Sequence, residues 1–194
     1  LPDKRRLTIY FAALGVGYLA IEMALLQKFG LLLGHPNHAL SVVLASLLLA
    51  TGLGSLWARR IVSALGNIRF VSYVLAAAIL IEYFAVFPRL PGLLPQPFSI
   101  RVLVVVLLVA PIGLCLGTFF PWVLDRLKDG APSFAPWAWG VNGIFSVVAP
   151  VLSVAVSMSF GTTALLLAAI PVYLFAGLLL PSTWAQATVE NPPG

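Results

Sequence analysis

Charged residues are scarce in this chain, and their scarcity excludes most soluble folds. Only 9% of the 194 residues are charged, whereas charged residues make up about a quarter of a typical soluble domain. So few charges cannot cover the surface of a soluble domain of this size. A lipid bilayer accepts apolar exposed faces, so the 61% hydrophobic content indicates an integral membrane protein rather than a soluble enzyme.

Cysteine and histidine are also nearly absent, which limits redox and metal chemistry. The single Cys115 excludes an internal disulfide, and its apolar neighbours indicate a small packing residue. His35 and His38 flank Pro36-Asn37, with no cysteine or carboxylate nearby in the sequence. We interpret this segment as a turn in which Asn37 or His38 caps the next helix, with a zinc or copper pair as the weaker alternative. No cofactor or metal is therefore expected.

Six apolar segments are long enough to cross a bilayer, which takes roughly 20 helical residues. They lie at about 7–29, 38–57, 70–87, 102–122, 137–158 and 162–180. We expect an all-α bundle of six transmembrane helices, forming one domain over 1–184, and a polar tail at 185–194. The first helix should end at Gly34, because glycine followed two residues later by proline is a helix stop signal. Since the chain begins at Leu1, we expect a processed protein or part of a longer one.

The basic residues between the segments predict how the chain sits in a membrane. With six spans, one side carries Lys4, Arg5, Arg6, Arg59, Arg60, Arg69, Arg126 and Lys128, and the other carries Lys28, Arg89 and Arg101. Cytoplasmic loops are enriched in lysine and arginine, so both termini should lie in the cytoplasm, with the chain in the plasma (inner) membrane. The net charge of +5 therefore reports topology and not nucleic-acid binding. The tryptophans at 57, 122, 137, 139 and 184 fall at the same span ends, where an indole has one apolar face and one wet edge.

Small residues predict where the helices pack. Gly113 and Gly117 form a GxxxG pair in the fourth segment, and Ala149, Ser153 and Ser157 repeat at every fourth position of the fifth. Such rows let two helix backbones approach closely, which drives association in lipid. They support a packed bundle and identify no substrate.

Two carboxylates lie inside the apolar segments and need a reason to be there. Glu22 follows Leu7 by 15 residues and Glu82 follows Phe70 by 12, so they lie roughly 22 Å and 18 Å into their helices. Both helices start from the same side, which places the two carboxylates at similar depth. If the first and third helices face a common cavity, the pair forms a cation site. Tyr18, one turn before Glu22, is placed to hydrogen-bond it.

A structural explanation for the same carboxylates stays open. Arg89 is seven residues after Glu82 and able to reach towards it, and Glu22 has Lys28 or Arg101 as alternative partners. A carboxyl in such surroundings can also simply be protonated. Either ion pairing or protonation would leave these carboxyl groups with a structural role and no ligand-binding role.

Two amides interrupt the apolar segments. Gln27 and Asn142 are interpreted as polar groups that either line a cavity or hold helices together by hydrogen bonds. No nucleophile elbow, phosphate-binding loop or paired-aspartate motif occurs. The chain therefore shows no catalytic constellation of its own.

Three stretches carry a family resemblance. They are Gly17-Tyr-Leu-Ala-Ile-Glu22 with its continuation through Gly34-His35-Pro36 to Gly52-Leu-Gly54, then Gly117-Thr-Phe-Phe-Pro121, and Pro136-Trp-Ala-Trp-Gly140-Val-Asn142-Gly143. Together they resemble the carboxyl-terminal membrane region of the bacterial spermidine synthase-like membrane proteins. In that family an aminopropyltransferase-like soluble domain is joined to polytopic membrane segments. Thr118-Phe119 departs from the Met-Pro that is more usual before the Phe-Pro pair.

The resemblance implies a membrane module and leaves its activity open. The family's catalytic domain is absent, so this chain is not expected to be an enzyme by itself. Its partners would be the lipid bilayer, a polyamine, and a fused or associated aminopropyltransferase-like domain. A weaker likeness to a six-helix half of the major facilitator superfamily favours a half-transporter for a small cation or proton, with a second membrane half as partner. A structural anchor or assembly subunit is the third alternative.

Overall fold

Helices form nearly the whole of this computed structural model, which describes residues 3–186, without the side chains of 129 and 130. Six stretches are long and apolar enough to cross a membrane, so the predicted all-α fold with six candidate spans is confirmed at that level. They are α1 (Lys4–Leu33), α2 (Pro36–Leu56), α4 (Ile68–Ile81) with its continuation to Leu93, α5 (Phe98–Gly130), η3 (Pro132–Phe134) with α6 (Ala135–Phe160), and α7 (Thr162–Leu179). Short helices α3 (Ala58–Leu65) and α8 (Ser182–Ala185) complete the fold. Most of the predicted polar tail, 187–194, lies outside the described residues.

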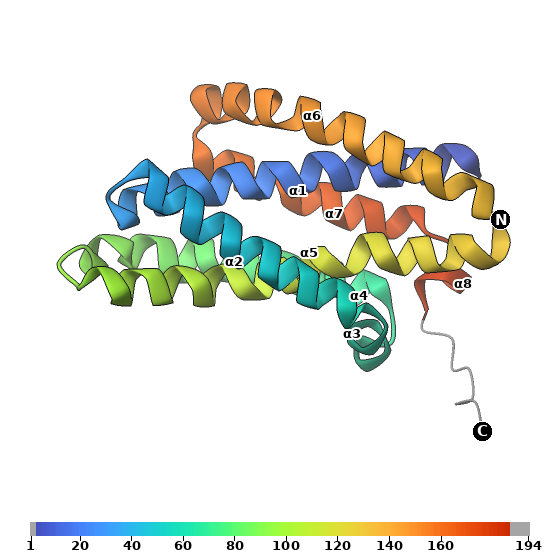
Figure 1. Cartoon of the computed structure of the whole chain (residues 1–194), viewed down its shortest axis with the longest axis horizontal. Coiled ribbons are helices and arrows are strands. Elements are labelled where there is room, and N and C mark those ends of the chain that lie inside the picture. Colours follow the sequence, from blue (N-terminus) through green and yellow to red (C-terminus); the bar gives the residue numbers. More distant parts are fainter. Residues whose placement is uncertain (1–2, 187–194) are drawn as a thin grey trace.

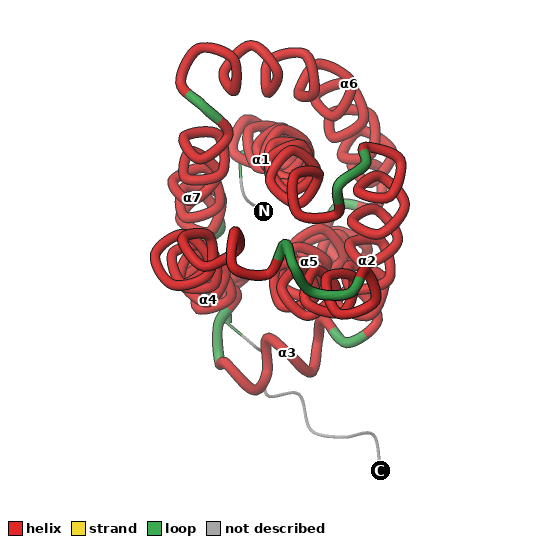
Figure 2. Tube along the Cα trace, turned by 90° about the vertical axis from the view of Figure 1, so that its left-hand side faces the viewer, coloured by secondary structure: helices red, strands yellow, loops and turns green. Residues whose placement is uncertain are grey.

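The long helices run side by side along the longest axis of the molecule, as Figure 1 shows. Both ends of the described chain lie at one end of the bundle, together with α3 and α8 (Figure 1). Viewed from the other end, α1 lies inside an arc of neighbours (Figure 2). It packs against α2, α5, α6 and α7, whereas α4 packs against α5 and α7. The core is therefore built around α1, with α5 and α7 between it and α4.

Glycines bring α2 and α5 into backbone contact. A Cβ atom on Gly117 would overlap the backbone of Thr51, and one on Gly54 would overlap the backbone of Leu114. At Gly113 the added carbon would lie 2.6 Å from the Ala50 Cβ. The predicted GxxxG pair is thus confirmed as a packing motif, and Gly54 supplies the complementary notch on α2.

The turn between the first two helices confirms one predicted boundary and corrects a cap. Gly34 ends α1 with a left-handed φ of 76°, and its N–H donates to the Gly30 carbonyl. Such a φ favours glycine, as the stop signal predicts. The expectation that Asn37 or His38 caps α2 is wrong: the His35 imidazole accepts from the Asn37 N–H. Pro36 occupies the first helical position, which makes the residue before it the N-cap.

Trp122 differs from the interfacial tryptophan that the sequence predicts. Its side chain is only 4% exposed, and its indole N–H donates to the Trp184 carbonyl over 3.0 Å. The Arg126 guanidinium lies 3.6 Å from the centre of its ring. Trp137 and Trp139 are 56% and 60% exposed, as interfacial tryptophans should be. Trp122 is buried because α8 folds back over the end of α5.

Arg69 holds the end of α7, and its replacement by methionine is expected to destabilise the bundle. Its Nε donates to the Gly177 carbonyl over 3.2 Å and its Nη2 to the Leu180 carbonyl over 2.8 Å. Losing these charge-assisted bonds should lower the free energy of unfolding by about 2 kcal/mol. Denaturation in mixed detergent micelles measures it. Arg6→Met, at an exposed position, is the control, and equal stability of both variants would contradict the capping role.

Candidate functional site

Glu82 is the most unusual polar residue of the bundle. It is 3% exposed and continues the buried face of α4, one turn beyond Ile79. Neither of its carboxylate oxygens has a hydrogen-bond partner among the described residues. A buried carboxyl without a donor is stable only when it is neutral or holds a cation. Glu82 is therefore the strongest candidate for a functional carboxylate in the described bundle.

The backbone opens where this carboxyl group lies. Glu82–Val86 (η1) forms a π-turn, in which the Phe87 N–H donates to the Glu82 carbonyl, and Phe87–Leu93 (η2) then tightens into a 3₁₀ helix. Pro88 explains the change, because it has no N–H to donate and its ring collides with the carbonyl four residues earlier. Single π-turns inside helices occur frequently at functional sites.

Arg89 does not neutralise Glu82. Its Nη1 donates to the Ala85 carbonyl instead, and its side chain is exposed. The π-turn and the 3₁₀ helix change the angle between positions 82 and 89, so the predicted alignment along one α-helical face does not arise. Among the described residues, the only carboxylate in an ion pair is Asp125.

Glu22 and Tyr18 lie one turn apart on α1, and both are half-buried. The Tyr18 hydroxyl lies near the Thr51 side chain of α2 and near Glu22. The alternative partners of Glu22 are engaged elsewhere. The Lys28 ammonium lies 5.0 Å from the centre of the Phe87 ring, and Arg101 donates to the Leu32 carbonyl over 2.8 Å. Neither Lys28 nor Arg101 forms an ion pair with Glu22 within the described residues.

The two carboxylates belong to different parts of the bundle. Glu22 lies on α1 and Glu82 in η1, directly after α4, and α5 and α7 each pack against both α1 and α4. α1 does not pack extensively against α4. A longer cation with separated ammonium groups is compatible with two separate carboxylates.

Gln27 and Asn142 both connect helices. Gln27 Oε1 accepts from the hydroxyls of Ser157 on α6 and of Thr162 on α7, the latter over 3.0 Å. Asn142 Nδ2 donates to the Phe11 carbonyl of α1 over 3.2 Å. Of the two roles considered for these amides, the structure places them as links between helices.

The histidine pair lies at the opposite end of the bundle from the two chain ends. The rings of His35 and His38 have centroids 5.5 Å apart, and His38 packs 4.9 Å from the Phe98 ring. Within the described residues, no group of three histidine, cysteine or carboxylate side chains is placed to hold a metal ion. His35 acts as the cap of α2 described above.

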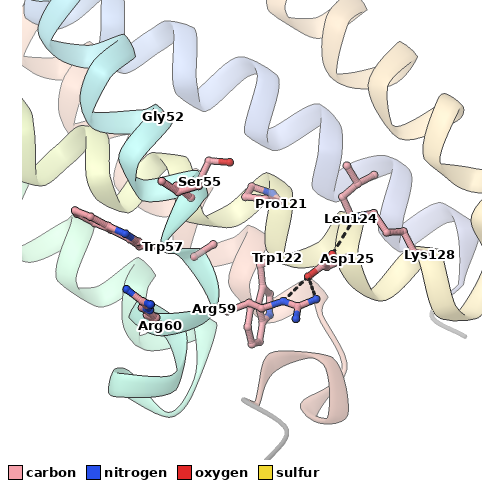
Figure 3. A pocket seen from close by; sticks show the side chains of 12 residues that line it. Gly52, Ser55, Trp57, Arg59, Arg60, Pro121, Trp122, Leu124, Asp125 and Lys128 are labelled. Atoms are coloured by element: carbon pink, nitrogen blue, oxygen red, sulfur yellow. Dashed lines mark hydrogen bonds and ion pairs between the residues drawn. The ribbon is translucent and has the colours of Figure 1, made fainter. Parts of the chain in front are cut away.

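One polar cluster was not predicted from the sequence. Asp125 accepts from Arg59 Nε over 2.7 Å and from Lys128 Nζ over 3.1 Å, joining α5 to α3 (Figure 3). The three-residue spacing of Asp125 and Lys128 signals a helical ion pair, whereas Arg59 is 66 positions away. Basic residues that predict topology thus also link two helices.

Comparison of the chain with protein-family models, with curated proteins and with solved structures finds no match.

Proposed function

We propose that this chain is a membrane-embedded module that binds a cation inside its helix bundle, with Glu82 as the principal ligand. The supporting observation is the buried carboxylate of Glu82, whose oxygens have no partner among the described residues. Intramembrane carboxylates are costly and usually mark ion or proton pathways. Glu22, with Tyr18 beside it, is the second carboxylate of the proposal.

A polyamine is the proposed cation. The resemblance to spermidine synthase-like membrane proteins suggests this class, and the separate positions of Glu22 and Glu82 suit a ligand with several ammonium groups. The module would then anchor an aminopropyltransferase-like domain, fused or associated, at the plasma (inner) membrane. The end carrying both termini and most of the lysines and arginines would face the cytoplasm.

Spermidine binding tests this proposal directly. Isothermal titration of the chain in lipid nanodiscs should detect binding, and Glu82→Gln should weaken it about tenfold or more, because a charge-assisted contact is lost. Glu22→Gln should weaken it less, since its side chain is only half-buried. Asp3→Asn is the matched control: Asp3 is exposed and caps α1, a role that asparagine can fill.

Two outcomes would overturn the polyamine assignment. One is a parent chain that does not bind spermidine, and the other is unchanged affinity in both glutamine variants. Glutamine variants that change the stability of the chain but not its spermidine binding would favour the structural anchor.

A half-transporter for a small cation or proton is the second candidate. The π-turn at Glu82 favours it, because interrupted helices near ion-binding carboxylates are common in carriers. Liposomes containing the chain should then dissipate an imposed proton or sodium gradient, and Glu82→Gln should abolish this flux. Sealed, inert proteoliposomes at every pH would exclude the transporter and leave the binding proposal intact.

A further inference from the structure

A pocket separate from Glu22 and Glu82 lies at the end of the bundle that carries both ends of the described chain. It is a pocket of about 860 Å³ between the end of α2, the first turn of α3 and the last turns of α5 (Figure 3). Neither Glu22 nor Glu82 lines it. Any ligand bound there is therefore independent of the proposed cation site.

The pocket is positively charged. Among the described residues, Arg59, Arg60, Lys128 and Asp125 line it, and three cations against one carboxylate give this lining a net charge of +2. Asp125 pairs with both Arg59 and Lys128, whose side chains are 78% and 67% exposed, so the two cations are linked to α5 and still accessible from solvent. This arrangement favours an anion.

The apolar surface next to the pocket favours a lipid anion over a free one. Exposed leucines at 48, 49, 53 and 56 run along α2 towards the pocket and are between 43% and 77% exposed. Trp57, 43% exposed, lies at its rim. Tryptophan and leucine side chains in this order match the headgroup and acyl regions of a bilayer.

We propose that this pocket binds the phosphate headgroup of an anionic phospholipid whose acyl chains lie along the exposed leucines of α2. Basic pockets between helices on the cytoplasmic side of membranes bind such headgroups, and each nearby basic residue adds to the attraction. Arg59 and Lys128 are paired with Asp125, and Arg60 adds a third cation. The pocket should therefore prefer a lipid whose headgroup is negative overall to one whose phosphate is balanced by a cationic group.

Native mass spectrometry of the chain extracted from mixed vesicles of phosphatidylglycerol and phosphatidylcholine tests the site. The parent should retain one phosphatidylglycerol per chain in preference to phosphatidylcholine. The double variant Arg60→Gln/Lys128→Gln should bind it about tenfold more weakly. Both side chains are exposed, so the variant should fold, which circular dichroism can verify.

A matched variant separates local binding from general charge. Lys4→Gln/Arg6→Gln removes the same charge from the same end but outside this pocket, and it should retain the lipid. Equal retention by parent and Arg60→Gln/Lys128→Gln, or equal loss in both double variants, would overturn the proposal. Displacement of the lipid by inorganic phosphate at low millimolar concentration would also overturn it, because the ligand would then be a free anion.

Discussion

Replacing Glu82 with methionine is expected to make the bundle more stable while abolishing cation binding. The substitution removes a buried carboxyl group whose oxygens have no partner among the described residues, and it fills the space with an apolar side chain of similar length. Relieving one unsatisfied buried polar group should raise the free energy of unfolding by about 1–3 kcal/mol. Unfolding by denaturing detergent in mixed micelles measures the gain, and spermidine titration in nanodiscs measures the loss.

Glu22→Met is the control for this result, because Glu22 is half-buried and has Tyr18 nearby. Its effect on stability should be smaller than that of Glu82→Met. A destabilised Glu82→Met variant would show that the carboxyl group contributes to packing or to a structural contact. The free energy of unfolding would then contradict the proposal that Glu82 serves as a cation ligand and not as a structural residue.

Adding one methyl group at Gly117 should disrupt the contact between α2 and α5. The new carbon would overlap the Thr51 carbonyl, which is part of a helix backbone and cannot rotate away. Overpacking of this kind costs roughly 1–3 kcal/mol, and at this position we expect the upper end of that range or a failure to fold. Detergent unfolding and the yield of monodisperse protein measure the effect.

Gly52→Ala provides the matched control on the partner helix. Nothing lies within 4 Å of a Cβ atom added there, so alanine should be neutral or slightly stabilising through its higher helix propensity. Equal behaviour of Gly117→Ala and Gly52→Ala would mean that α2 and α5 do not pack through their backbones.

The sequence was sufficient to predict the candidate spans, because length and hydropathy alone identify them. The helices are longer than the apolar segments: α1 begins at Lys4 rather than Leu7, and α5 continues to Gly130 rather than ending near Trp122. Polar residues at these ends remain helical because the backbone hydrogen bonds of a helix form whether or not the side chains are apolar. Asp3 sets the start of α1 by accepting from the Arg5 N–H.

The surroundings of the candidate ligands were much less predictable. The sequence places Glu22 and Glu82 at similar depth, but depth does not say which helices are neighbours. That depends on how α5 and α7 pack against α1 and α4, a tertiary feature that no spacing within one segment encodes. The π-turn at Glu82 was missed for a related reason. Proline can bend, tighten or widen a helix, and the packing around Pro88 decides among these responses.

The predicted partners of the charged residues show the same limit. Lys28, Arg89 and Arg101 were close enough in sequence or depth to neutralise Glu22 or Glu82, yet each contacts a ring or a carbonyl instead. In contrast, Gln27 and Asn142 form hydrogen bonds between helices, one of the two roles considered for them from the sequence.

The backbone contact between α2 and α5 also restricts how the molecule can move. Helices held apart by long side chains can slide past one another as those side chains change rotamers. Gly54 and Gly117 instead seat each backbone in a notch of the other, so sliding by one turn would bring bulky residues into the notch and force the pair apart. In any rearrangement that displaces one of these two helices, α2 and α5 should therefore move together as one rigid pair.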